Sequence, residues 1–235
     1  MTSVVQLLQR SSLAGAMLFC AAMPMAHAQE AEEQPAQAEQ DKGFYVTAGV
    51  GAAWPQDVTG KSTVLDIDVK GQYSLDVGFA GEVGAGYDFG NVRTELTYLY
   101  NNASLDRLKV KALGQEITSS VSSGDVNTNS VMVSTYVDIP TKGRVSPYLG
   151  GGIGYTNVSW GSYGVSALGT NVKQSAGNQG VFGYQGKLGI SYLASKKTDV
   201  FVEATYQGTA GFAVDGVSYD PLSSWGARLG ARYRF

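Results

Sequence analysis

The sequence predicts an all-β fold, a closed up-and-down antiparallel barrel of eight strands, and three observations support this prediction. From Gly43 onward, apolar and polar side chains alternate every two residues in eight segments that are rich in glycine and tyrosine. Short and long connections alternate strictly between these segments. The last segment, 225–235, carries apolar side chains on one face and Arg228, Arg232 and Arg234 on the other. Because successive side chains of a strand point to opposite faces, each segment forms a strand with one apolar face.

The first residues predict export from the cytoplasm. Arg10 precedes an apolar run from Leu13 to Ala22, and Ala26 and Ala28 supply the small residues of a cleavage site. The apolar run is too short to span a membrane, so we interpret residues 1–28 as a secretory signal peptide cleaved after Ala28.

Residues 29–42 differ in composition from everything that follows. They are acidic, rich in glutamine and alanine, and have no apolar periodicity. Such a segment cannot bury enough surface to order itself, so we predict a disordered acidic linker in the periplasm. In residues 43–235 acids and bases are equal in number, which argues against a nucleic-acid partner. We expect no transmembrane helix, because no apolar run of about twenty residues is present.

The first four strands are expected at residues 43–54, 73–89, 92–102 and 126–139. The polar faces of the second and third segments carry Glu82, Arg93 and Glu95. Segments of about ten residues have the length that a tilted strand needs to cross a bilayer. The apolar faces are formed, in chain order, by Phe44, Val46, Val50 and Trp54, by Val77, Phe79, Val83, Tyr87 and Phe89, by Val92, Leu96, Tyr98 and Tyr100, and by Val131, Val133, Val137 and Ile139.

The last four strands are expected at residues 145–158, 179–194, 199–208 and 225–235. The alternation is weakest in the first of them, because glycines occupy most of its polar face. The next two segments place Lys187 and Glu203 opposite their apolar faces. The apolar faces are formed, in chain order, by Leu149, Ile153 and Tyr155, by Phe182, Tyr184, Leu188, Ile190 and Tyr192, by Val200, Val202 and Tyr206, and by Trp225, Leu229, Tyr233 and Phe235.

The connections indicate which membrane the barrel crosses. Three links are short, and four long polar stretches alternate with them. This pattern is typical of bacterial outer-membrane barrels, whose short turns are periplasmic and whose long loops are extracellular. Aromatic rings gather at both ends of the segments, as in the rims of such barrels. The second long loop could extend into a ribbon, so the strand number is open by one hairpin. The short links are 89–91, 140–144 and 195–198, and the long ones are 55–72, 103–125, 161–178 and 209–223.

The polar faces would meet inside the barrel, where eight strands leave room only for side chains. Charges enclosed there need partners, because burying an unpaired charge is costly. Inward glycines such as Gly84, Gly86 and Gly152 would make room for long arginines and glutamates. We therefore predict a salt-bridged plug, with a gated ion path as the alternative. The expected network contains Glu82, Arg93, Glu95, Lys187, Glu203, Arg228, Arg232 and Arg234.

The C-terminal octapeptide resembles a known recognition signal. Outer-membrane barrels are recognised for assembly by a polar-x-Gly-x-x-aromatic-x-aromatic pattern, and RLGARYRF is similar to it. The resemblance implies that the barrel assembly machinery binds this end of the chain. The matching positions are Arg228, Gly230, Tyr233 and Phe235.

A second resemblance lies in the middle of the chain. YVDIP at 136–140, followed by SPYLGGGIGY at 146–155, is similar to the central hairpin of the opacity-protein family of surface antigens. These are small eight-stranded barrels that resemble the barrels of OmpA and OmpX. The resemblance covers residues 43–235 and implies an outer-membrane location, surface exposure and, in some members, adhesion through variable loops. Because the sequence ends at Phe235, no peptidoglycan-binding domain like that of OmpA is expected.

We expect no enzymatic activity, metal or cofactor. The only histidine, His27, and the only cysteine, Cys20, lie in the predicted signal peptide. The histidine-dependent mechanisms of outer-membrane barrel enzymes would therefore lack their base. A stretch at 66–71 resembles the start of a calcium loop, but a lysine occupies its fifth place, where an oxygen ligand is needed.

The sequence favours a non-enzymatic outer-membrane barrel that supports envelope integrity and contacts the surroundings through four exposed loops. A small pore-forming, porin-like channel is the alternative. A soluble periplasmic barrel with an apolar ligand, its faces turned inside out, is a third possibility. The expected partners are outer-membrane lipid, lipopolysaccharide and a surface or host ligand. Arg107, Lys109 and Lys111 form a basic face that could contact lipopolysaccharide phosphates or an acidic partner, or could simply be solvated.

Overall fold

The computed structural model describes residues 42–64, 67–112, 115–122, 124–167, 170–174, 176–214 and 217–235. Every regular element within these ranges is a β-strand. In the same ranges, no helix is long and apolar enough to cross a membrane. The signal peptide predicted for 1–28 and the linker predicted for 29–42, apart from Lys42, lie outside the described residues.

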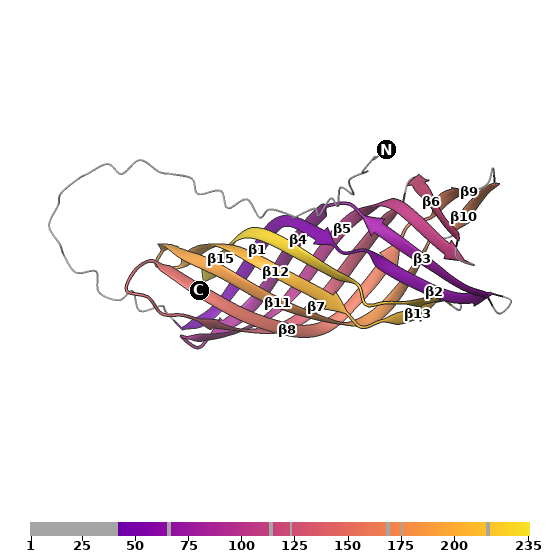
Figure 1. The fold of residues 1–235 in the computed structure, drawn as a ribbon. Helices are drawn as coiled ribbons and strands as arrows, with labels where there is room; N and C mark the ends of the chain where they lie inside the picture. Colours follow the sequence, from indigo (N-terminus) through magenta and orange to yellow (C-terminus); the bar gives the residue numbers. More distant parts are fainter. Residues whose placement is uncertain are drawn as a thin grey trace, which may run out of the picture. The chain divides into compact units, whose positions relative to one another are not determined.

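Eight strands close into a ring in chain order, with every neighbouring pair antiparallel. The last strand pairs back with the first, so that Tyr45 lies opposite Arg234 and Trp54 opposite Trp225. Figure 1 shows the tilted strands of this ring. The predicted eight-stranded antiparallel barrel is confirmed. The strands are β1 (Gly43–Pro55), β4 (Gly78–Asp88), β5 (Val92–Ala112), β7 (Asp125–Asp138), β8 (Val145–Trp160), β11 (Gly177–Ser195), β12 (Thr198–Thr209) and β15 (Ser223–Arg234).

The four long connections contain β-ribbons instead of irregular loops. β5 continues past the ring, and its far part pairs with β3 on one side and β6 on the other. Further pairings of β14 with β2 and of β6 with β9 join these ribbons into an extended sheet. Figure 1 shows the ribbons at one end of the ring. The ribbon strands are β2 (Val58–Val64), β3 (Ile67–Leu75), β6 (Gln115–Ser122), β9 (Tyr163–Ala167), β10 (Thr170–Gln174), β13 (Phe212–Val214) and β14 (Val217–Tyr219).

One predicted boundary was wrong. The strand expected from residue 73 begins at Gly78, and Tyr73 belongs to β3. The error arose because the alternation of β3 runs directly into that of β4, with only Asp76 and Val77 between them. The ribbon suggested for the second long loop is present, since 103–125 contains the end of β5 and all of β6.

The two ends of the ring differ in their connections. At the turn end, short links join β4 to β5, β7 to β8, and β11 to β12. Residues Gly43 and Phe235 lie at this end as well, where the Phe235 N–H donates a hydrogen bond to the Phe44 carbonyl at 3.1 Å. The ribbon end carries the four long connections.

The apolar faces of the eight strands point outward, as the alternation predicts. Leu229 is 61 % exposed, whereas its neighbour Arg228 is 2 % exposed. Aromatic rings gather near both ends of the ring: Trp225 contacts Tyr206 at a centroid distance of 4.9 Å toward the ribbons, and Phe44 contacts Tyr87 at 4.9 Å near the turns. This apolar surface with aromatic borders is the form that a barrel presents to lipid.

Candidate functional site

A cluster of four charged side chains fills the middle of the barrel. Lys187 on β11 places its Nζ 2.6 Å from Glu82 Oε2 and 3.0 Å from Glu203 Oε1. Arg228 approaches the same two carboxylate oxygens from β15, at 3.6 Å and 3.8 Å. Tyr148 donates its hydroxyl to Glu203 Oε2 at 2.8 Å. All five side chains are buried, so this cluster is an enclosed ionic network.

The contact between Lys187 and Glu82 crosses the whole barrel. β4 and β11 are separated by three strands in both directions around the ring, so they face each other across the lumen. A second crossing lies nearer the ribbon end, where Asn101 of β5 donates to Gln207 Oε1 of the opposite strand β12 at 2.9 Å. Arg228 also donates hydrogen bonds to Asn101 Oδ1 and to Gln207 Oε1. The two crossings obstruct the lumen at successive levels.

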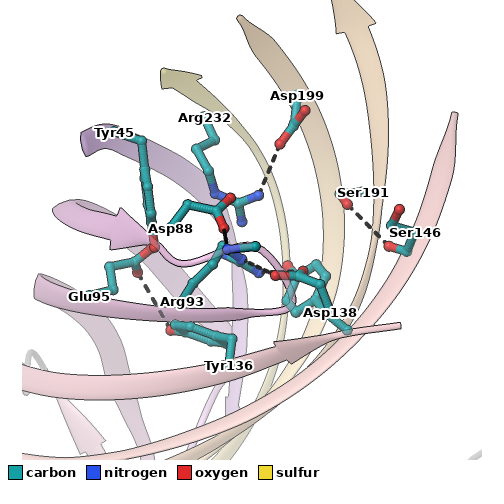
Figure 2. A network of polar contacts seen from close by, with 12 residues as sticks. Tyr45, Asp88, Arg93, Glu95, Tyr136, Asp138, Ser146, Ser191, Asp199 and Arg232 are labelled. Atoms are coloured by element: carbon teal, nitrogen blue, oxygen red, sulfur yellow. Dashed lines mark hydrogen bonds and ion pairs between the residues drawn. The ribbon is translucent and has the colours of Figure 1, made fainter. Parts of the chain in front are cut away.

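A second ionic cluster lies near the turn end. Arg93 binds both carboxylate oxygens of Asp138, at 2.5 Å and 3.0 Å. Arg232 contacts Asp199 at 3.1 Å, and Arg234 contacts Asp199 at 2.7 Å. Arg234 also reaches Asp88 of β4 at 3.3 Å. Figure 2 shows the side chains of Arg93, Asp138, Arg232 and Asp199 converging between the strands. The two-point contact of Arg93 with Asp138 fixes geometry as well as charge.

Inward aromatic rings separate and cover the charged groups. The Arg93 guanidinium lies 4.9 Å from the centroid of Tyr136 and 5.0 Å from that of Tyr148. Tyr45 and Tyr136 donate their hydroxyls to Glu95, at 3.0 Å and 3.5 Å (Figure 2). Glu95 therefore receives phenol hydrogen bonds, and cation–π contacts supplement the ion pairs around Arg93.

The inward glycines make room for more than the predicted arginines and glutamates: Gly49 faces Glu82, whereas others face tyrosine rings. A Cβ added at Gly150 would collide with the ring of Tyr136, and one added at Gly189 would collide with the ring of Tyr148. These glycines thus accommodate tyrosine rings at least as much as arginine and glutamate side chains. The rings are large and inward-facing, so they need a neighbouring strand without a side chain at that level.

The structure places all eight residues of the expected network inside the barrel. Seven of them form the ion pairs of the two clusters, whereas Glu95 receives hydrogen bonds from Tyr45 and Tyr136. Residues absent from the expected network complete these contacts. Each of these residues lies on the inward face of its strand, so the alternation predicts that it points into the barrel. Its contact partners could not be predicted, because they depend on how the ring closes. The additional residues are Asp88, Asp138, Asp199, Tyr45, Tyr136, Tyr148, Asn101 and Gln207.

A row of lysines crosses the exposed face of the ribbons. The pairing register places Lys61 of β2 opposite Lys70 of β3, and Lys70 opposite Lys111 of β5. Each of the three is exposed. Asp220 pairs with Lys61 at 2.9 Å at one end of the row, and Glu116 of β6 is the backbone partner of Lys111 at the other. Like charges placed directly opposite destabilise a sheet, so Lys70 sits at an electrostatically unfavourable centre.

The basic face expected at Arg107, Lys109 and Lys111 overlaps this row of lysines only in part. Arg107 is exposed and contacts Asp106 at 2.6 Å, while Lys109 is half-buried opposite Gln72. Only Lys111 of the three belongs to the lysine row. In the described ranges, no cluster of three or more histidine, cysteine or acidic side chains has a geometry suited to a metal ion.

An outward apolar surface and an enclosed ionic interior define this protein as a membrane-spanning β-barrel. The family described as "Outer membrane protein beta-barrel domain" matches residues 12–235. The chain therefore belongs to this family of outer-membrane barrels.

One curated relative is similar to part of this chain. A protein of Gluconacetobacter diazotrophicus called "Outer membrane protein" is 31 % identical over 143 residues, which cover 58 % of this chain and 36 % of that protein. This chain thus spans about a third of the length of that relative.

The solved structures show similarity of fold alone. The outer membrane protein OprG from Pseudomonas aeruginosa has a TM-score of 0.51 and 16 % identity, covering 84 % of this chain and 98 % of that chain. The outer membrane protease OmpT from Escherichia coli also has a TM-score of 0.51, with 8 % identity, covering 83 % and 97 %.

Proposed function

We propose that this chain is a non-enzymatic barrel of the outer membrane that supports envelope integrity and contacts the surroundings with its ribbon end. In this proposal residues 1–28 direct export, residues 29–42 form a periplasmic linker, and the ribbons face outward. The observation that carries the proposal is the ionic contact of Lys187 with Glu82 across the barrel, at 2.6 Å. Because this contact closes the interior of the barrel, the ribbons are the part of the protein that can bind a partner outside the membrane.

The final strand has a proposed role in assembly. β15 pairs with both β1 and β12, so the ring closes only when this strand is in place. This supports the proposal that Arg228, Gly230, Tyr233 and Phe235 form the signal bound by the barrel assembly machinery. A non-enzymatic role is further supported by the position of the only histidine at residue 27, before the barrel.

We expect no steady conductance from the purified protein in planar lipid bilayers. The Lys187–Glu82 and Asn101–Gln207 contacts obstruct the lumen at two levels, and an eight-stranded ring is only wide enough for side chains. Current traces at fixed voltage provide the measurement, with a large-pore porin in the same bilayers as the positive control. Long-lived openings of uniform size would favour the alternative, a small porin-like channel.

Contact with anionic surface groups is proposed for the lysine row. A phosphate or other anion placed over Lys70 would relieve the repulsion from the lysines on either side. We expect the double variant Lys70→Gln and Lys111→Gln to bind lipopolysaccharide more weakly, by about 1 kcal/mol per lysine. Binding of fluorescent lipopolysaccharide to the protein in lipid nanodiscs measures this effect, which added salt should diminish.

The matched control neutralises two lysines at the other end of the barrel. Lys142 and Lys196 are both exposed in the turn-end links. The double variant Lys142→Gln and Lys196→Gln changes the net charge equally and should bind lipopolysaccharide like the unaltered protein. Equal weakening by both double variants would mean that net charge, and not the lysine row, governs binding.

A further inference from the structure

A cavity of about 310 Å³ lies within the ribbon end. Its wall combines the ribbons β2, β3, β13 and β14 with the far parts of β5, β7, β8 and β11. Apolar side chains of both sets of strands line it: Val58 of β2, Leu105 of β5 and Val158 of β8 are each less than 9 % exposed. The ribbons thus form a second apolar interior, separate from the ionic interior of the barrel. We call this cavity the ribbon cup.

The lining of the ribbon cup specifies a chemical class. The described residues that line it include no charged side chain, and most are apolar or aromatic. Phe212 and Tyr219 stack with ring centroids 5.2 Å apart, and Tyr73 lies 6.2 Å from Tyr219. Trp160 forms a further part of the wall. Aromatic rings gain from offset and edge contacts with other rings, whereas a charged ligand would lose its hydration without gaining a partner.

The volume limits the size of the occupant. An engineered apolar cavity of about 150 Å³ accepts benzene, and natural ligand sites begin at about 300 Å³. The ribbon cup, at about 310 Å³, therefore has room for a molecule of one or two fused rings.

A polar crossing of the barrel lies beyond the apolar floor of the ribbon cup. Leu75, Val126 and Leu222 line both the cup and a smaller cavity of about 70 Å³, which also has Asn101 and Gln207 in its wall. These two amides bond to each other across the barrel at 2.9 Å, with the ionic network beyond them. An apolar molecule that enters the cup meets this floor and has to leave by the ribbon end.

We propose that the ribbon cup binds a small uncharged aromatic molecule of one or two rings, without passing it through the barrel. The site is distinct from the lysine row, which lies on the exposed face of the ribbons. The proposal therefore does not depend on lipopolysaccharide contact, and the failure of either one leaves the other intact.

Trp160 offers a direct test. The sequence has three tryptophans, so replacing Trp54 and Trp225 with phenylalanine leaves Trp160 as the only one. In this background, 1-nitronaphthalene, an uncharged two-ring quencher, should quench the fluorescence of Trp160 along a saturable curve. Naphthalene should reverse the quenching by competition. Quenching by probe dissolved in the surrounding lipid is linear in probe concentration. It can therefore be separated from the saturable quenching by probe bound in the ribbon cup.

Two further variants decide the result. Val217→Phe fills the cup and should weaken the saturable quenching at least tenfold, whereas Val202→Phe, on the outer apolar face, should leave it unchanged. Circular dichroism of each variant verifies that the strands are retained. Should Val217→Phe disturb the ribbons, naphthalene competition in the unaltered cup still decides the matter. Purely linear quenching, or saturable quenching that naphthalene does not reverse, overturns the proposal.

Discussion

Replacing Lys187 with methionine is expected to lower the free energy of unfolding of the barrel by about 3–5 kcal/mol. The Lys187 ammonium contacts Glu82 at 2.6 Å and Glu203 at 3.0 Å, and all three side chains are buried. Methionine fills a similar volume but leaves the two carboxylates with Arg228, whose nitrogen lies 3.6 Å and 3.8 Å from them. The loss therefore reflects uncompensated buried charge more than lost packing.

Urea unfolding of the protein in lipid vesicles, followed by tryptophan fluorescence, provides the measurement. Lys142→Met removes the same type of side chain from an exposed turn-end link and should change the free energy of unfolding by less than about 0.5 kcal/mol. Adding Glu82→Gln to Lys187→Met should cost less than the sum of the single changes, because the second change removes one of the stranded charges. A loss below about 1 kcal/mol for Lys187→Met would show that the ionic network is not a major source of stability.

The strands and the direction of their faces could be predicted because both depend on local alternation. The side chain of Ile190 points away from that of Lys187 or Ser191 in any extended strand, whatever its neighbours are. The cost of burying charge then decides which face points outward. A slip of one residue in β15 would move Arg228, Arg232 and Arg234 into lipid. A strong energetic penalty for the wrong arrangement made the prediction secure.

The pairing inside the barrel could not be predicted because it depends on the closed ring. Lys187 and Glu82 are 105 residues apart and meet only because β4 and β11 face each other across the lumen. The same holds for the contact of Asn101 with Gln207. The ribbons raise a related difficulty, since the row of Lys61, Lys70 and Lys111 depends on the register of three strands.

Three inward tyrosines were absent from the expected network. Tyr45, Tyr136 and Tyr148 occupy inward positions, although tyrosine is common on the outer face as well. Their position in the alternation assigns them correctly, whereas composition suggests the membrane rims. Their role becomes clear only in the structure, where their hydroxyls reach Glu95 and Glu203.

The second large effect is expected on the outer face, where Leu229→Arg should lower the free energy of unfolding in lipid vesicles by about 2–4 kcal/mol. Leu229 is 61 % exposed and lies on β15 between Trp225 near the ribbons and Tyr233 near the turns. Its partners in the register are Val50 and Val202, which are also exposed and apolar. An arginine there would meet hydrocarbon on every side.

The depth dependence of this effect separates lipid exposure from an ordinary packing defect. Tyr233→Arg places the same charge near the turn-end rim, where the cost should fall to about 0–1 kcal/mol, because the guanidinium can reach the interface. Leu229→Ala measures the loss of the side chain alone. Spin labels at Leu229 and Ile190 should be accessible to oxygen dissolved in the acyl chains and protected from a water-soluble relaxation agent. A Leu229→Arg variant as stable as the unaltered protein, with labels that report water, would mean that the apolar face does not contact lipid; the ionic interior would then have to be explained without a membrane.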